Sequence, residues 1–380
     1  MIKVLQFICP SGLFGAEMWV LALAKHLDPK EVSCRLAVSH ESTSQSLELF
    51  ERFGKLGLNA DKIRMKGKFD FRAIAKLKAL VQHEQIDVLH THGYKSDILG
   101  LLAARMADIR VLSTPHGFEN VKDLKLQAFI KVGNLALRHF DRVAPLSKRL
   151  VEDMARIRVP EHKIRFIRNG VDLQEVNQEL QRPFEPGLRS EEKKSIGYVG
   201  QLSHRKNLGD MIDAFALFCR DHDNVRLLLV GDGPERIELQ QKANTLECGD
   251  RIEFLGYRSD RLRVVKEMDL FCMTSSLEGI PRSLMEAMAM RVPVVAYEIP
   301  GVDKLILDGQ TGLLAPFGDK AALKNCWERL LGDGQLSKTL AKNGRNHVEK
   351  NFSAERMAAE YAQLYRELLN RESPQLQQQV

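Results

Sequence analysis

The 380-residue sequence predicts an α/β fold of two tandem domains, each built on a parallel sheet with helices on both faces. Short apolar strands alternate with helical segments through the first 172 residues, as parallel strands joined by right-handed crossovers require. Residues 181–194, QRPFEPGLRSEEKK, are polar, contain two prolines and lack periodicity, which is typical of a linker. Because the alternation then restarts, we expect an N-terminal domain over 1–180 and a C-terminal domain over 195–353.

The first half opens with an apolar strand, IKVLQFI at 2–8, followed by the loop CPSGLFGAE and an apolar helix over 16–27. A strand, a glycine-containing loop and a helix open many nucleotide-binding α/β domains, although the dinucleotide fingerprint G-x-G-x-x-G is not present here. The remaining predicted strands of this half are 32–38, 86–90, 110–114 and 143–147, and the remaining predicted helices are 43–56, 72–83, 96–106, 121–139 and 148–156.

The second half repeats the pattern. Its predicted strands are 195–201, 225–231, 251–256, 268–275, 292–296 and 312–316, and its predicted helices are 207–221, 234–247, 258–266, one from about 281, 319–332 and 335–350. We expect the last helix, 354–370, to pack back on the first domain, and residues 371–380 to form a disordered tail. Parallel sheets bind ligands at the carboxyl ends of their strands, so we also expect a ligand cleft between the domains.

The distribution of charge indicates what kind of molecule the protein binds, and the cysteines indicate its cellular compartment. Residues 1–180 contain 28 Lys and Arg against 21 Asp and Glu, a net +7, whereas 181–380 contain 28 against 29. This diffuse excess indicates an anionic partner such as a phosphorylated acceptor or a lipid surface, and without a zinc-finger, RRM or HTH motif it does not indicate nucleic acid. Six scattered cysteines with no Cys-x-x-Cys pair predict reduced thiols in a cytoplasmic protein. No run of about 18 apolar residues is present, so any membrane contact is expected to be peripheral.

The stretch 276–296, SLEGIPRSLMEAMAMRVPVVA, is the strongest candidate for a functional site. Pro281 suits the first position of a helix, where its missing N–H has no partner to lose. Glu278 then flanks the helix N-terminus, which favours a phosphate, and Glu286 lies about one and a half turns in. Acidic residues near a helix start are common, but the apolar neighbours of Glu286 predict a buried carboxylate that needs a partner. A nucleotide sugar, with hydroxyls on both sides of a diphosphate, fits this layout.

Five segments, in this order along the chain, resemble motifs of the retaining glycosyltransferases of family 4. They are the loop SGLFGAE, similar to Gly-Gly-x-Glu; RNGVD, similar to P-N-G-V-D; VGQLSHRKN, similar to G-R-L-x-x-x-K-x; EGIPRSLMEAMAMRVPVVA, similar to the E-x7-E signature; and DGQTGLLAP, similar to D-G-x-T-G-x-L. The resemblance covers nearly the whole chain. It implies the GT-B fold, in which two Rossmann-like domains with parallel sheets face each other across a cleft.

Carried over position by position, the resemblance implies that Glu286 binds the nucleotide ribose, Glu278 the donor-sugar hydroxyls and Lys206 the diphosphate. It further implies that His116, directly after a predicted strand, faces the donor sugar, so that His116, Glu278 and Lys206 act at the reacting centre. Gly15 would let the backbone approach the diphosphate, although it could equally be a plain turn glycine. The implied donor-binding residues are Gly15, Gln201, Arg205, Lys206, Arg258, Glu278, Gly279, Ile280, Leu284 and Glu286.

Four positions depart from the family pattern. Gln201 stands where an arginine is usual, which leaves more of the phosphate charge to Arg205 or Lys206. Arg291 and Pro300 replace glycines, and Lys304 stands where a glutamate is expected. Choice of the base should depend on the chain near Tyr257 and Arg258.

The histidine pair His90 and His92, in VLHTHG, has the spacing of one strand face and could be mistaken for metal ligands. With no carboxylate motif beside the pair and no D-x-D motif in the chain, we expect a structural or acceptor-lining role. We expect no metal and no cofactor besides the nucleotide-sugar co-substrate.

We therefore expect a retaining hexosyltransferase that uses a UDP, GDP or ADP sugar and a glycan or glycolipid acceptor, in the synthesis of cell-surface polysaccharide or lipopolysaccharide. For retention without an enzymatic nucleophile, the resemblance implies front-face attack, in which a departing phosphate oxygen takes the proton of the acceptor. The alternatives are a GT-B epimerase or hydrolase acting on nucleotide sugars, and a binding scaffold that has lost catalysis. The basic helix at 121–139 is either a core helix with a solvated face or a contact with an anionic membrane at its inner face.

Overall fold

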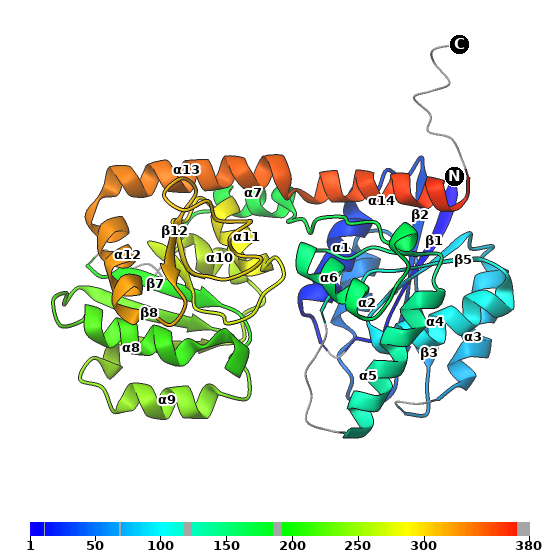
Figure 1. The fold of residues 1–380 in the computed structure, drawn as a ribbon, viewed down its shortest axis with the longest axis horizontal. Coiled ribbons are helices and arrows are strands. Elements are labelled where there is room, and N and C mark those ends of the chain that lie inside the picture. The colour runs from blue at the N-terminus through cyan, green and yellow to red at the C-terminus, as the bar shows by residue number, and fades with distance from the viewer. Residues whose placement is uncertain (11, 68–69, 118–123, 185–191, 371–380) are drawn as a thin grey trace, which may run out of the picture. The chain divides into compact units, whose positions relative to one another are not determined.

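The computed structural model describes the chain except residues 11, 68–69, 118–123, 185–191 and 371–380, and the side chains of 124–126. The chain divides into two compact units (Figure 1). The first is Met1–Gly170 together with the segment from Ala354 onward, and the second is Val171–Ser353. The first unit thus ends at residue 170, where the sequence had suggested 180. The middle of the expected linker and the expected tail lie outside the described residues.

The first unit is a parallel sheet in the order β3-β2-β1-β4-β5-β6. Its strands are β1 (Ile2–Ile8), β2 (Val32–His40), β3 (Ala60–Arg64), β4 (Val88–His92), β5 (Arg110–Ser113) and β6 (Arg142–Val143). Its α-helices are α1 (Gly15–His26), α2 (Glu48–Lys55), α3 (Arg72–His83), α4 (Tyr94–Ala107), α5 (Leu124–Ala136), α6 (Lys148–Arg156) and α14 (Ala354–Leu368).

The second unit is a parallel sheet in the order β12-β11-β10-β7-β8-β9. Its strands are β7 (Lys194–Val199), β8 (Val225–Val230), β9 (Ile252–Gly256), β10 (Leu270–Met273), β11 (Val294–Glu298) and β12 (Leu313–Pro316). Its α-helices are α7 (Leu173–Gln181), α8 (Leu208–Phe218), α9 (Arg236–Asn244), α10 (Arg261–Lys266), α11 (Arg282–Ala289), α12 (Lys320–Gly332) and α13 (Gly334–Asn351).

The two six-stranded parallel sheets confirm the predicted α/β fold class, but the edge of the first sheet differs from prediction. Strand β3 was not predicted, because Ile63 is its only buried residue and the segment carries no apolar alternation. Strand β6 ends at Val143 instead of continuing to residue 147. Pro145 lies two residues further on and has no N–H with which to extend a ladder. Of the predicted basic helix, residues 121–123 lie outside the description and 137–139 form a 3₁₀ turn.

Each sheet is buried on both faces, because alternate residues of one strand enter different cores. In β1, Val4 and Ile8 pack in one cluster while Leu5 and Phe7 pack in another. The second sheet is divided in the same way, with its central strands again contributing to two clusters. This two-sided burial explains why the strands read as continuous apolar runs in the sequence.

The strand orders define where a ligand can be held in each unit. The chain reverses its direction of winding between β1 and β4 in the first sheet, and between β7 and β10 in the second. At such a point the two loops that leave the carboxyl ends of the strands diverge to opposite faces of the sheet, and ligands of open α/β sheets bind there. Of the predicted site residues, Gly15 follows β1, and those from Gln201 to Lys206 and from Glu278 to Glu286 follow β7 and β10, so they lie at these two positions. His116 and Arg258 instead follow the neighbouring strands β5 and β9.

Candidate functional site

Two loops that leave the carboxyl ends of β7 and β10 are tied together at the switch point of the second unit. The first contains the 3₁₀ turn His204–Lys206, and the second runs from Thr274 to Pro281. The backbone N–H and the hydroxyl of Ser276 both donate to the carbonyl of Arg205, at 2.8 and 3.1 Å. The hydroxyl of Thr274 donates to the carbonyl of Lys206 at 3.1 Å. These bonds fix the two loops side by side.

The loops bring Lys206 and Glu278 together as a buried ion pair. Only 8% of Lys206 and 7% of Glu278 are exposed, and the guanidinium of Arg205 lies 3.9 Å from the other carboxylate oxygen. Burial lowers the pKa of Lys206 below its ordinary value, and the carboxylate of Glu278 opposes that shift. Two residues that the sequence assigned to the diphosphate and the sugar therefore contact each other directly.

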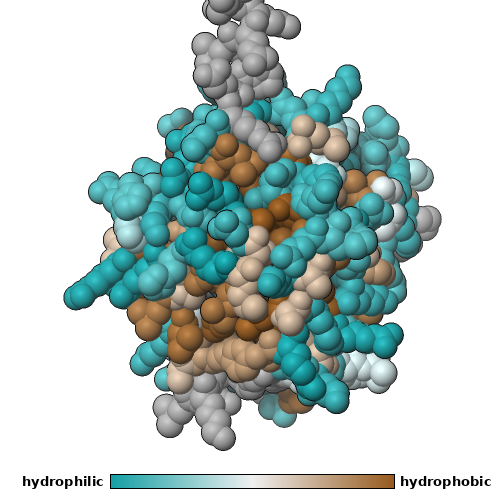
Figure 2. All heavy atoms as spheres, turned by 90° about the vertical axis from the view of Figure 1, so that its right-hand side faces the viewer, coloured by the Kyte–Doolittle hydropathy of each residue, from teal (hydrophilic) through white to brown (hydrophobic). Residues whose placement is uncertain are grey.

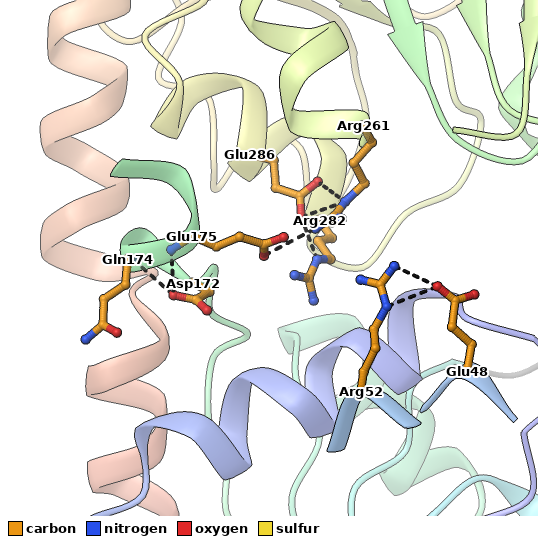
Figure 3. A network of polar contacts seen from close by, with 8 residues as sticks. All are labelled: Glu48, Arg52, Asp172, Gln174, Glu175, Arg261, Arg282 and Glu286. Carbon is orange, nitrogen blue, oxygen red and sulfur yellow. Dashed lines mark hydrogen bonds and ion pairs between the residues drawn. The ribbon is translucent and has the colours of Figure 1, made fainter. Parts of the chain in front are cut away.

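The second carboxylate of the stretch, Glu286, is held by two arginines (Figure 3). Arg261, the first residue of α10, donates to both oxygens, at 3.0 Å to Oε2 and at 2.7 and 3.2 Å to Oε1. Arg282, one turn earlier on α11, donates to Oε1 at 2.7 Å. Arg261 also lies 3.6 Å from Glu175 on α7.

Glu286 is 1% exposed and paired with two arginines, which confirms the prediction of a buried carboxylate that needs a partner. Burial alone would raise the pKa of Glu286, but the fields of Arg261 and Arg282 outweigh it and hold that pKa below its ordinary value. Glu286 is therefore an ionised acceptor in the interior of the unit. Because three of the four arginine contacts fall on Oε1, Oε2 keeps lone-pair capacity for a further donor.

The N-terminus of α11 lies between the two carboxylates in the sequence, but the helix begins one residue later than predicted. Pro281 is the N-cap, with an extended ψ of 122°, and Arg282 is the first helical residue. The turn before it is packed against Gly301, whose φ is +98° and whose added Cβ would lie 1.9 Å from the carbonyl oxygen of Gly279. Only glycine fits at 301, and this close contact fixes the backbone that carries Glu278.

Other predicted site residues make different contacts from those of Lys206, Glu278 and Glu286. Gln201 is exposed, and its carbonyl accepts a hydrogen bond from the hydroxyl of Tyr198 at 3.1 Å. The guanidinium of Arg258 pairs with Asp260 in its own loop, at 2.6 and 2.7 Å. The side chain of Leu284 is fully buried in the core, which leaves only its backbone for a ligand, and Ile280 packs at the edge of the same core.

In the first unit, Gly15 and His116 follow strands β1 and β5. Gly15 starts α1, and an added Cβ there would meet nothing within 4 Å. Neither packing nor a positive φ demands glycine at this position, so the structure offers no structural reason for it. His116 is half-buried, and its Nε2 lies 3.2 Å from Nδ1 of His92 at the end of β4.

The three histidines of the first unit form one cluster around Trp19. The rings of His90, His92 and His116 each lie between 5.2 and 5.9 Å from the Trp19 ring, centroid to centroid. Burial lowers the pKa of all three, that of His116 to about 3, so they are neutral at physiological pH. Among the described residues no group of three or more His, Cys, Asp or Glu side chains has an arrangement that could hold a metal ion.

Sequence reasoning missed Arg261 and Arg282. Arg282 precedes Glu286 by four residues, the spacing of neighbours on one helix face, so this pair was visible in the sequence. Arg261 lies 25 residues before Glu286 on another helix, and no local pattern connects the two.

The two halves of the chain match two family models. Residues 15–175 match the family described as Glycosyltransferase Family 4, and residues 181–347 match Glycosyl transferases group 1. The boundary between the matches falls between residues 175 and 181.

Curated relatives and solved structures extend over most of the chain. N-acetyl-alpha-D-glucosaminyl L-malate synthase of Bacillus anthracis is 27% identical over 325 residues, which cover 83% of this chain and 84% of that protein. UDP-Gal:alpha-D-GlcNAc-diphosphoundecaprenol alpha-1,3-galactosyltransferase of Escherichia coli is 27% identical, covering 78% and 79%. The crystal structure of Anabaena HepE in complex with UDP and glucose superimposes with a TM-score of 0.81 at 21% identity, covering 96% and 99%.

Proposed function

Because this chain belongs to glycosyltransferase family 4, we propose that it transfers a hexose-type sugar from a nucleoside-diphosphate sugar to a hydroxyl of a glycan or glycolipid, with retention of anomeric configuration. That it is a glycosyltransferase follows from the family. The proposal concerns the donor, the stereochemistry and the acceptor. The observation that carries it is the buried Lys206–Glu278 pair beside the N-terminus of α11.

This arrangement suits a donor with a diphosphate next to a sugar. The ammonium of Lys206 has three donors and spends one on Glu278, so two remain for phosphate oxygens. The amides in the first turn of α11 have no intrahelical acceptor and add positive potential at the same place. Glu278, an ionised acceptor, is suited to sugar hydroxyls, and each such charge-assisted hydrogen bond contributes roughly 1.5–3 kcal/mol.

The nucleoside end of the donor is assigned to Glu286. Its Oε2 accepts only one of the arginine contacts, and a ribose hydroxyl could donate to the remaining lone pair. Arg261 and Arg282 keep the carboxylate charged and oriented. The base then lies toward Tyr257, whose side chain is 56% exposed.

We propose front-face attack without a metal ion. Neither Glu278 nor Glu286 acts as nucleophile or general acid, because each is occupied by cationic partners that keep it an acceptor. Charge that develops on the leaving diphosphate is stabilised by Lys206, Arg205 and the α11 amides, and a phosphate oxygen accepts the proton of the acceptor hydroxyl. Gly15 and His116 serve the diphosphate and the transferred sugar respectively.

The activities in the names of the relatives support the proposed donor and acceptor classes. They include a UDP-galactose enzyme, a phosphatidyl-myo-inositol mannosyltransferase of Mycobacterium leprae and, among solved structures, complexes with UDP and UDP-glucose. We therefore propose a UDP sugar as the donor to test first, and a cytoplasmic enzyme that makes cell-surface polysaccharide or lipopolysaccharide.

The test is a thermal-shift panel of UDP, GDP and ADP sugars, followed by product analysis with and without acceptors. We expect one nucleotide series to raise the Tm, little nucleotide release without an acceptor, and an α-linked product from an α-linked donor. Release or epimerisation of the donor alone would favour a hydrolase or epimerase, and no shift with any nucleotide sugar would favour a binding scaffold. Lys206→Ala should abolish most transfer, and Arg236→Ala is its control because Arg236, the first residue of α9, pairs with Asp232 at the surface.

We also propose a peripheral contact between the first unit and an anionic membrane. On α5, Val132 and Leu135 are 51% and 48% exposed, and Lys131 is exposed beside them. On the adjoining α4, Leu102 and Met106 are 43% and 56% exposed. Figure 2 shows hydrophobic side chains at the surface among hydrophilic ones.

Apolar side chains next to basic ones suit the boundary between lipid headgroups and acyl chains. No helix in the described part of the chain is long and apolar enough to span a membrane. Sedimentation with vesicles containing phosphatidylglycerol should pull the protein down at low salt, and Val132→Ser with Leu135→Ser should reduce this. Equal binding to phosphatidylcholine vesicles would contradict the role of charge.

A further inference from the structure

A continuous chain of hydrogen bonds runs from His116 through the interior of the first unit to the C-terminal helix. Nε2 of His116 lies 3.2 Å from Nδ1 of His92, and Nε2 of His92 lies 2.8 Å from Oε1 of Gln6 on β1. The amide nitrogen of Gln6 donates at 3.1 Å to the hydroxyl of Tyr365 on α14, which lies 2.8 Å from Nδ1 of His90. Apart from His116, every one of these side chains is at least 95% buried.

The series of hydrogen bonds continues beyond His90 and ends at a second tyrosine. Nε2 of His90 lies 2.8 Å from the hydroxyl of Thr114, which in turn lies 2.8 Å from the hydroxyl of Tyr361. Thr114 and Tyr361 are fully buried. Tyr361 and Tyr365 lie one turn apart on α14, so this helix supplies both hydroxyls.

The side-chain amide of Gln6 determines which group donates and which accepts at each hydrogen bond in this series. Its oxygen can only accept, so the neutral His92 donates through Nε2 and its Nδ1 is left as an acceptor. His116 must then carry its proton on Nε2. On the other side the amide nitrogen can only donate, so the hydroxyl of Tyr365 donates onward to Nδ1 of His90. Burial keeps the pKa values of His90 and His92 low, which favours the neutral rings that this arrangement of donors and acceptors requires.

We propose that Gln6, His92 and Tyr365 are positioning residues that fix His116 as the neutral Nε2–H tautomer. In that state Nδ1 of His116 can only accept a hydrogen bond, so it selects a hydroxyl of the transferred sugar and cannot serve as a proton donor. The inference rests on the proposed function only for the identity of the hydroxyl. The tautomer itself is a property of the free protein.

The test compares two variants of the same helix. Tyr365→Phe removes the hydroxyl that joins Gln6 to His90, so the amide of Gln6 is free to turn over. Tyr361→Phe removes only the hydroxyl at the far end of the chain. Long-range ¹H–¹⁵N NMR of histidine-labelled protein reports the tautomer, with the His116 signals assigned by their loss in His116→Asn.

We expect a single Nε2–H tautomer of His116 in the unaltered protein and in Tyr361→Phe, and a mixture of tautomers in Tyr365→Phe. If the protein transfers sugar, the KM for the donor should rise in Tyr365→Phe by the reciprocal of the Nε2–H fraction, about twofold for an equal mixture, with kcat little changed. Should Tyr365→Phe fail to fold, Gln6→Met, which keeps the length and removes both polar atoms, takes its place.

An Nδ1–H tautomer in the unaltered protein would overturn the inference, as would a single unchanged tautomer in Tyr365→Phe, or the same mixture in Tyr361→Phe. Absence of any transferase activity would count against the proposed function alone, because the NMR measurement needs no substrate.

Discussion

Replacing one member of the Lys206–Glu278 pair should destabilise the second unit more than replacing both. With one partner gone, the other is left as a charge that is more than nine-tenths buried, and the typical cost is about 3–5 kcal/mol. Replacing both with apolar residues of similar volume removes the desolvation cost together with the attraction, and such exchanges are often close to neutral.

The coupling energy between the two side chains can be measured in a double-mutant cycle with Lys206→Met and Glu278→Leu. We expect each single variant to lower the free energy of unfolding by about 3 kcal/mol or more, and the sum of the two to exceed the loss in the double variant by at least about 3 kcal/mol. All three variants should lose transfer. Loss of activity in Lys206→Ala alone thus cannot be separated from a weakened fold, whereas the double variant isolates the ligand-binding role.

The assay can follow each unit separately because the chain contains two tryptophans, Trp19 in the first unit and Trp327 in the second. Both are buried, so their fluorescence should change on unfolding. In a Trp19→Phe background, denaturant unfolding followed by fluorescence reports the second unit alone.

The control is the ion pair between Arg236, the first residue of α9, and Asp232 in the loop before it. Their side chains are 33% and 56% exposed, and the N–O distance is 2.9 Å. Its coupling energy should not exceed about 1 kcal/mol, as for surface pairs in general. If the Lys206 and Glu278 substitutions prove additive within about 0.5 kcal/mol, the two charges are not the buried pair described above and the reasoning is wrong.

Three further outcomes test other parts of the structure. Arg261→Met should raise the pKa of Glu286, since the buried carboxylate loses its bidentate partner, and should weaken nucleotide binding at least tenfold. Calorimetry measures this affinity, and an unchanged affinity would show that Glu286 is not in the ribose site. Gly301→Ala should lower the Tm by several degrees, because the added Cβ would lie 1.9 Å from a carbonyl oxygen in the loop after β10. Gly15→Ala should leave the Tm unchanged and weaken donor binding, and equal Tm values for the two variants would contradict this reasoning. Burial raises the pKa of Asp97 to about 7, so the folded state holds an extra proton between pH 4 and 7. The free energy of unfolding should therefore fall by up to about 4 kcal/mol as the pH rises through that range. In denaturant titrations at several pH values, Asp97→Asn should abolish this pH dependence.

Much of the fold was predictable because burial leaves a local pattern in the sequence. Strands such as β1 and β8 are apolar on both faces, so they stand out as short continuous runs between helices. The edge strand β3 has no such pattern and was missed. The burial of Glu286 was predictable for the same reason, since its neighbours on α11 are apolar.

Pairings between residues far apart in the sequence were decided by the tertiary structure alone. Lys206 meets Glu278, 72 residues later, because β7 and β10 are neighbours in the sheet although two strands separate them in sequence. Gln6 meets Tyr365 because α14 returns to the first unit after the whole second unit has been completed.

The sequence by itself determined most of the strands and helices, the burial of Glu286, and which loops carry the charged groups, because these depend on residues a few positions apart. The pairing of those groups depends on strand order and on the return of the last helix. Both are set by contacts between residues tens to hundreds of positions apart, and no local periodicity records them.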